Sequence, residues 1–236
     1  AKEVLEPMGK RLKGIRLDSG DLAYLAKKAR RMLDKAGLED CKIMASNSLD
    51  EYTITSLLGQ GGPIDIFGVG ERLITSKSDP VFGAVYKIAG VEKNGVWEPR
   101  IKISESVEKI TNPGFKKVYR VYNDKGRAIA DLLTLLEEVP DTTEPYRYID
   151  PEQPWRELYL ENCTFKEMKQ LIIKDGKLIV KLPTLEELRQ YVKDQLDREI
   201  WLEEQRFENP HRHYLDMSPG YYQMKMDLLN RIFRKK

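Results

Sequence analysis

The fold of this chain is decided by the stretch GIRLDSGDL, residues 14–22, in which a short apolar segment turns into a helix. Ile15 and Leu17 predict a buried strand over about 13–17. Apolar residues then recur at spacings of three and four, which predicts a helix with one apolar face over about 21–36. Gly37 supplies a left-handed stop for that helix.

The turn between this strand and this helix contains an unusual concentration of polar groups. Arg16, Asp18, Ser19 and Asp21 contribute a guanidinium, two carboxylates and a hydroxyl within six residues. In parallel α/β sheets, ligands bind where the strands end. A purely structural alternative remains open, in which Asp18 or Ser19 caps the helix and Arg16 pairs with Asp21.

Two further strand–helix units follow, and together the three units predict a parallel sheet with helical crossovers. The second strand, at about 42–45, ends at SNS, residues 46–48, before a helix over about 49–58. The third strand, at about 64–67, ends at GVG, residues 68–70, and a short helical turn is expected near residue 71.

The three strand ends fall on one side of the predicted sheet, so their side chains are expected to form one site. Ser46 and Asn47 supply small hydrogen-bonding groups, and Gly68 and Gly70 let backbone N–H groups approach an anion. Each feature taken alone also suits an ordinary turn or cap. Their coincidence predicts a phosphorylated ligand with hydroxyl groups, and the carboxylate of Asp18 suits paired ribose hydroxyls.

Beyond residue 80 the pattern changes to hairpins and isolated helices. Strands at 83–89 and 96–103 are predicted to be joined at Asn94-Gly95, and further hairpins turn at 124–126 and 175–176. A capping box at Thr184–Glu187 and a Ser218-Pro219 pair predict two helix starts. We therefore predict a parallel α/β domain over 1–92 and an antiparallel β and helical region over 93–236.

Composition excludes several classes of protein. The 40 basic and 38 acidic residues give a formal net charge of +2, so no global field selects nucleic acid. No apolar run approaches the roughly 20 residues of a membrane span, and the two distant cysteines favour a reducing, cytoplasmic setting. Since a closed barrel needs eight strands, we expect the three units to be the C-terminal part of a longer protein or one piece of a cleaved or split one.

Six motifs in order along the chain resemble the nicotinate phosphoribosyltransferase family. They are GIRLDSGDL (14–22), SNSLDE (46–51), FGVGERLITS (67–76), GAVYK (83–87), the run from KISE to KITNPG (102–114) and the run from NPH to DMS (209–218). The resemblance implies the C-terminal part of an irregular, TIM-like α/β barrel with a second domain. It also implies an absent N-terminal half, because members of the family are nearly twice as long.

The resemblance further implies an activity. Such enzymes join nicotinate to phosphoribosyl pyrophosphate in NAD salvage, with Mg²⁺ on the pyrophosphate and ATP hydrolysis coupled through a phosphohistidine. Arg16 and Asp18 would be catalytic, and no residue is expected to be a metal ligand. The substrate-binding residues would be Ser19, Ser46, Asn47, Gly68 and Gly70. A cytoplasmic homodimer is expected, and this segment alone is expected to be inactive.

The chain departs from the family pattern at two positions. Glu71 stands where a threonine is expected, so a phosphate contact there is in doubt, and Ser48 replaces a common aspartate. Neither His211 nor His213 occupies the phosphohistidine position, and both are interpreted as surface or packing residues.

Two alternative functions remain open. One is a nicotinamide phosphoribosyltransferase, against which Leu17 and the GVGE turn at 68–71 argue. The other is a non-catalytic phosphosugar-binding subunit.

Overall fold

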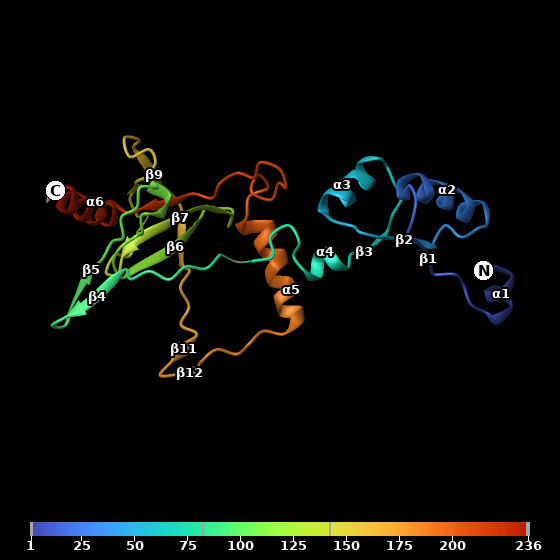
Figure 1. The fold of residues 1–236 in the computed structure, drawn as a ribbon, viewed down its shortest axis with the longest axis horizontal. Helices are drawn as coiled ribbons and strands as arrows, with labels where there is room; N and C mark the ends of the chain where they lie inside the picture. Colours follow the sequence, from blue (N-terminus) through green and yellow to red (C-terminus); the bar gives the residue numbers. More distant parts are fainter. Residues whose placement is uncertain (1, 82, 142, 235–236) are drawn as a thin grey trace. The chain divides into compact units, whose positions relative to one another are not determined.

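The computed structural model of the protein describes residues 2–81, 83–141 and 143–234, and the chain divides into two compact units. The first unit is Ala1–Ala84 and the second is Val85–Lys236, and each is described by itself (Figure 1). The predicted domain boundary at 92/93 falls inside a strand of the second unit, Gly90–Lys93.

The first unit contains the predicted parallel sheet. Its strands are β1 (Gly14–Leu17), β2 (Lys42–Ser46) and β3 (Ile66–Gly68), in the spatial order β1-β2-β3. Both pairings are parallel, with Ile15 opposite Ile43 and Ala45 opposite Phe67. The helices are α1 (Lys2–Leu5), η1 (Glu6–Met8), α2 (Leu22–Lys35), α3 (Glu51–Gly59) and α4 (Glu71–Ile74). The prediction of three strand–helix units is thus confirmed.

Helix α2 begins at Leu22, and its N-cap differs from the two residues that the sequence suggested. Asp21 is the N-cap, and its carboxylate accepts a hydrogen bond from the Tyr24 N–H at 2.9 Å. The expectation that Asp18 or Ser19 caps the helix is therefore wrong, because both residues lie too far from the first free N–H groups. Gly37 has φ of +72°, which confirms the left-handed stop.

The apolar face of α2 packs on the sheet and forms the core of this unit. Ala26 and Leu33 from the helix pack with Cys41 and Ile43, and Ala23 packs with Ala45 and Leu49. Ile43 and Ala45 alternate with more exposed neighbours along β2, as a strand covered on one face requires. This packing fixes the ends of β1 and β2 at the same edge.

The second unit is built on a four-stranded sheet. Its order is β10-β6-β7-β13, with bounds Thr164–Glu167, Lys116–Tyr122, Ala128–Leu135 and Leu215–Met217. The β6–β7 hairpin turns at 124–126, as predicted, and β10 joins β6 antiparallel. Strand β13 was not predicted, and it adds to β7 in the parallel direction after a long connection. Helix α6 (Pro219–Phe233) covers this sheet, and its Tyr221 is fully buried with Leu133 and Met217.

In the described part of this unit, the other strands form three small hairpins. They are β4–β5 (Gly90–Lys93 and Val96–Pro99), β8–β9 (Tyr146–Tyr148 and Leu158–Leu160) and β11–β12 (Ile173–Lys174 and Lys177–Leu178). Asn94 and Gly95 both have positive φ, which confirms the predicted tight turn. The predicted strand at 83–89 is wrong: within the described residues pairing starts at Gly90, and Val85 and Tyr86 are exposed without a partner strand.

The remaining helical elements are η2 (Val107–Lys109), α5 (Leu185–Asp194) and η3 (Gln195–Glu199). Thr184 and Glu187 form the predicted capping box at the start of α5. Ser218 caps α6, with Pro219 in the first turn, as predicted. None of the helices in the described residues is long and apolar enough to cross a membrane.

Candidate functional site

The end of β1 carries the first part of the candidate site. Arg16 lies on β1, and its Nε donates a hydrogen bond to Ser46 Oγ at the end of β2 over 2.9 Å. Its Nη2 donates to Asp18 Oδ2, in the turn after β1, over 2.8 Å. The guanidinium therefore joins two neighbouring strand ends. The alternative pairing of Arg16 with Asp21 does not form, because Asp21 caps α2.

The end of β2 turns sharply before α3. Asn47 and Ser48 have φ of +102° and +48°, values that side chains other than glycine rarely adopt. Such strained backbone is concentrated at functional sites. The Ser48 hydroxyl donates to Asn47 Oδ1 at 3.3 Å, and both residues are exposed.

The end of β3 lies against β2. Gly68 is opposite Ser46 in the sheet, and a Cβ at Gly68 would stand 3.2 Å from the Ser46 Cβ and 2.8 Å from the Met44 methyl carbon. A side chain at position 68 would thus push on the serine that binds Arg16. Gly70 has open space around its Cα and precedes α4 without a side-chain cap.

Glu71 follows these glycines, at the position where the sequence departs from the family pattern. Its side chain is exposed, and the Lys77 ammonium lies 3.3 Å from its carboxylate. This ion pair offsets part of the negative charge beside the glycine turn.

The strand ends leave groups available for a ligand. Among the described residues, Asp18 Oδ1 and the third nitrogen of Arg16 have no partner, and both side chains are about 60% exposed. Ser19 is exposed in the same turn. The arrangement offers acceptors for hydroxyl groups beside a planar donor for an oxyanion. The roles of Arg16, Asp18, Ser19, Ser46, Asn47, Gly68 and Gly70 toward a substrate stay predictions.

Asp50 is a residue of this region that the sequence reasoning missed. Its carboxylate caps α3 by accepting from the Thr53 N–H at 2.8 Å, and the Arg72 guanidinium of α4 lies 3.7 Å away. The hydrogen bond from Thr53, and to a lesser extent Arg72, lowers the pKa of Asp50. An aspartate directly before a helical segment is a common N-cap, so the sequence contained a signal for this role of Asp50.

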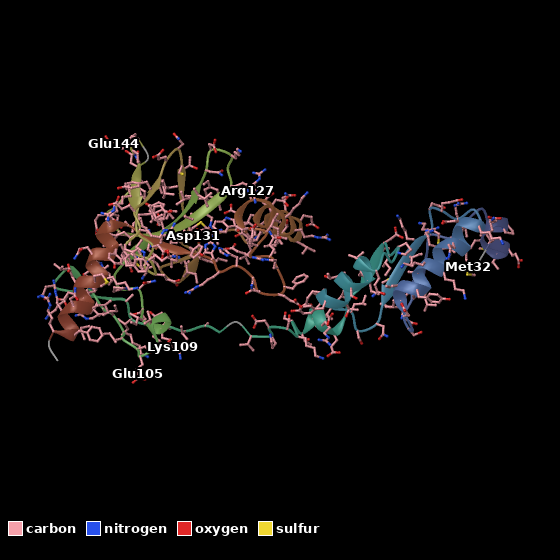
Figure 2. All side chains as sticks on the ribbon, turned by 90° about the horizontal axis from the view of Figure 1, so that it is seen from above. Met32, Glu105, Lys109, Arg127, Asp131 and Glu144 are labelled. Atoms are coloured by element: carbon pink, nitrogen blue, oxygen red, sulfur yellow. The ribbon has the colours of Figure 1, made fainter. Side chains whose placement is uncertain are left out.

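The second unit contains a charged network that was also not predicted. Arg120 on β6 binds both oxygens of Asp131 on β7, at 2.8 and 2.9 Å, and its third nitrogen lies 3.2 Å from Glu199 (Asp131 is labelled in Figure 2). His213 Nε2 lies 2.8 Å from Asp131 Oδ2, and Nδ1 lies 2.8 Å from Glu204 Oε1.

Burial and hydrogen bonding set the protonation of this network. Burial would raise the pKa of Asp131, but Arg120 and His213 outweigh it and lower that pKa. Burial alone would lower the pKa of His213, and its bonds to Asp131 and Glu204 raise it instead. Because both ring nitrogens face carboxylates, the surroundings favour the protonated imidazole, and His213 connects β7 to the segment before β13. His211 stacks on Trp201, which agrees with its interpretation as a packing residue, whereas His213 has carboxylate partners on both ring nitrogens, a role that the interpretation as a surface or packing residue did not foresee.

No group of three or more His, Cys, Asp or Glu side chains in the described residues is arranged to hold a metal ion.

Comparison with known proteins shows which family and which relatives this chain is similar to. Residues 115–225 match the family described as the nicotinate phosphoribosyltransferase C-terminal domain. The nicotinate phosphoribosyltransferase of Bacillus subtilis is 40% identical over 220 residues, which cover 93% of this chain and 45% of that protein. The Caenorhabditis elegans enzyme of the same name is 36% identical over 231 residues, covering 93% of this chain and 40% of that protein. The chain thus spans about half the length of the curated relatives it matches.

Solved structures agree in fold. The crystal structure of human nicotinic acid phosphoribosyltransferase has a TM-score of 0.71 at 24% identity, covering 95% of this chain and 42% of that one. The nicotinate-nucleotide pyrophosphorylase of Pyrococcus furiosus has a TM-score of 0.52 at 24% identity, covering 80% of this chain and 41% of that one. The chain therefore has the mixed α/β structure of these proteins.

Proposed function

This chain belongs to the nicotinate phosphoribosyltransferase family, and we propose that the protein joins nicotinate to phosphoribosyl pyrophosphate. The products are nicotinate mononucleotide and pyrophosphate, in the salvage branch of NAD biosynthesis. The names of the relatives support this substrate pair. The observation that carries the proposal is the position of Arg16, which lies between Asp18 and Ser46 where two parallel strands end.

Each predicted site residue has a part in the proposal. Asp18 accepts hydrogen bonds from ribose hydroxyls, with Ser19, Ser46 and Asn47 beside it. Gly68 and Gly70 give the 5′-phosphate close access to backbone N–H groups. Arg16 faces either the carboxylate of nicotinate or the oxygens of the phosphoribosyl group. Both roles use the planar donor that remains beside its two existing bonds.

The chemistry requires positioning more than covalent catalysis. The nitrogen of nicotinate attacks ribose C1 as pyrophosphate leaves, and positive charge develops on the ribose ring. A carboxylate that fixes the hydroxyls, such as Asp18, aligns C1 with the attacking nitrogen and stabilises that charge. The protein therefore contributes by holding both substrates in line.

We propose ATP as a co-substrate and Mg²⁺ as a companion of the pyrophosphate. The described residues contain no metal-binding group of acidic, histidine or cysteine side chains, so the protein side chains here do not fit a metal cage. In the proposal the cation is therefore carried by substrate oxygens, and no step is assigned to it.

We also propose that the three parallel strands are part of an irregular, TIM-like barrel. The support is that β1 and β3 each pair on one side only among the described residues, while all three strands run parallel. The remaining strands would come from a further part of the same protein, and the protein is proposed to act as a cytoplasmic homodimer.

The test is an assay of the full-length protein for nicotinate mononucleotide, with nicotinate or nicotinamide as acceptor. Formation of nicotinate mononucleotide and pyrophosphate from nicotinate, with ATP stimulating the rate, is the expected result. A preference for nicotinamide would favour the related amide enzyme. Binding of phosphoribosyl pyrophosphate without turnover would favour a non-catalytic subunit.

A further inference from the structure

The second unit contains a cavity of about 420 Å³ that has no part in the proposed reaction. Its wall combines α6 with the segment around η2, the loop after β8 and the residues that lead into β13. The apolar part of the wall includes Ile110, Met217, Tyr222, Met226 and Leu229. A cavity of this size whose wall combines apolar side chains with several polar groups is typical of sites for small organic ligands.

Three basic side chains line this cavity, of which Arg212 pairs with Glu152 and His213 lies between Asp131 and Glu204. Lys225 is the third. It lies on α6, it is half-buried, and its Nζ donates to Asn112 Oδ1 at 2.8 Å. Among the described residues no carboxylate lies within ion-pair distance of Lys225. A lysine ammonium has three donors, so two of them have no acceptor in the described part of the chain. Burial without a counter-ion lowers the pKa of Lys225.

Lys116 is a second lysine whose ammonium group is hydrogen-bonded to Asn112. Its ammonium donates to the backbone carbonyl of Asn112 at 2.9 Å and to that of Gly114 at 3.3 Å. Burial, and then the charge of Lys169, lower the pKa of Lys116. Among the described residues, these two half-buried ammonium groups thus have the neutral oxygens of Asn112 and Gly114 as acceptors, and an anion bound beside Lys225 in the cavity would compensate positive charge there.

The acidic residues of the wall are already engaged. Glu152 pairs with Arg212 at 2.7 Å, and Asp150 is buried and accepts from the Glu152 N–H at 2.8 Å. Both belong to the loop after β8, whereas Lys225 belongs to α6. An anionic group is therefore favoured at the α6 wall and disfavoured at the loop.

We propose that this cavity binds a small organic anion with an apolar body, of the aromatic carboxylate class, whose carboxylate pairs with Lys225. The body of the ligand packs against Tyr222, Met226 and Leu229. The inference goes beyond the proposed reaction, because none of the strand-end residues takes part in it. It gives the second unit a ligand site of its own.

The experiment is a calorimetric titration of the full-length protein with 1-naphthoate. Saturable binding is expected, and Lys225→Met is expected to weaken it about 10- to 100-fold, since one charge-assisted contact is lost. Lys225→Arg should restore most of the affinity. Lys177→Met removes an exposed lysine of β12 in the same unit and is the matched control, with affinity unchanged.

Two further measurements separate charge from shape. The uncharged 1-naphthalenemethanol should bind wild type and Lys225→Met equally weakly. Leu229→Trp, which fills the cavity, should abolish binding of both probes, with circular dichroism and thermal melting confirming that each variant is folded. Lack of saturable 1-naphthoate binding by the wild type, or equal affinity in wild type and Lys225→Met, would overturn the proposal. Neither result depends on whether the protein has transferase activity.

Discussion

Asp18 and Asp21 are only three residues apart but have separate roles, which sequence reasoning did not distinguish. Asp21 satisfies a free N–H of α2, whereas Asp18 has Arg16 as its one side-chain partner among the described residues and is largely exposed. A capping aspartate contributes to stability, and an exposed carboxylate at a strand end is available to a substrate. Substituting the two residues in parallel therefore separates folding from catalysis.

Asp18→Ala in the full-length enzyme is expected to lower kcat/KM by about a hundredfold, because a positioned acceptor for ribose hydroxyls is lost. Its melting temperature should stay close to that of the wild type. Asp21→Ala should instead lower the free energy of unfolding by about 1 kcal/mol. Steady-state kinetics and thermal melts of both variants are the measurements. Full activity of Asp18→Ala would remove Asp18 from the site.

Arg16→Lys keeps a positive charge but loses the fork that binds Ser46 and Asp18 together. If the guanidinium reads the carboxylate of nicotinate, the KM for nicotinate should rise by about tenfold or more, and the KM for phosphoribosyl pyrophosphate should change less. Each substrate is varied in turn at saturation of the other. A rise confined to phosphoribosyl pyrophosphate would assign Arg16 to that substrate instead.

At the scale of elements, His213 connects parts of the second unit that are distant in sequence. It lies between Asp131 on β7 and Glu204 in the turn after η3, and it precedes β13. Arg120 on β6 and Glu199 at the end of η3 complete the charges that surround this contact. The parallel strand β13 thus enters the sheet beside a charged contact, which a local pattern in the sequence cannot reveal.

The stability of the second unit is expected to fall as the pH rises from about 6.5 through the folded pKa of His213. The folded pKa of His213 is raised above its unfolded value of about 6.5, so its contribution is complete below that pH. The contribution is lost as the pH rises through the folded pKa. Urea unfolding of the wild type and His213→Gln between about pH 5 and 9 measures it, and the two curves should converge at high pH.

Asp216 titrates in part of the same range and has to be separated from His213. Burial, and then the charge of Asp150, raise the pKa of Asp216 to about 6, so its contribution also decreases as the pH rises. The same measurement in an Asp216→Asn background removes this effect. A difference between wild type and His213→Gln that does not change with pH would show that His213 acts by packing alone.

The N-caps of α5 and α6 provide a matched pair. Ser218 is fully buried, accepts from the Tyr221 N–H at 3.1 Å and donates to Glu138, whereas Thr184 caps α5 at an exposed position. Ser218→Ala should cost about 2 kcal/mol, because it also leaves Glu138 without its hydroxyl partner. Thr184→Ala should cost about 1 kcal/mol or less. Equal costs in denaturant unfolding would contradict the role of burial.

For the whole molecule, the open edges of the parallel sheet are the main feature. In the described residues β1 and β3 each have one unpaired edge, and the apolar face of α5 is exposed through Leu188, Tyr191 and Val192. Unpaired strand edges and exposed apolar faces promote association. Residues 1–236 expressed alone are therefore expected to aggregate and to form no nicotinate mononucleotide. Monomeric behaviour in size-exclusion chromatography with a cooperative thermal transition would contradict this.

The sequence alone determined the elements that depend on local signals, which are the three strand–helix units of the first unit and several turns and helix caps of the second. Alternating apolar residues, the Asn94-Gly95 turn, the Gly37 stop and the capping box at Thr184 each act within a few residues, and the structure has all four. The prediction that the three strand ends lie at the same edge of the sheet followed from the parallel topology of successive strand–helix units.

Tertiary structure decided the contacts between distant segments. The bond from Arg16 to Ser46 spans 30 residues, and the bond from His213 to Asp131 spans 82. The choice of Asp21 over Asp18 as the cap depended on where packing of Ala23 and Ala26 against the sheet fixed the first turn of α2. The partners of a charged side chain are chosen by burial and by the register of neighbouring strands, and these are properties of the folded chain as a whole.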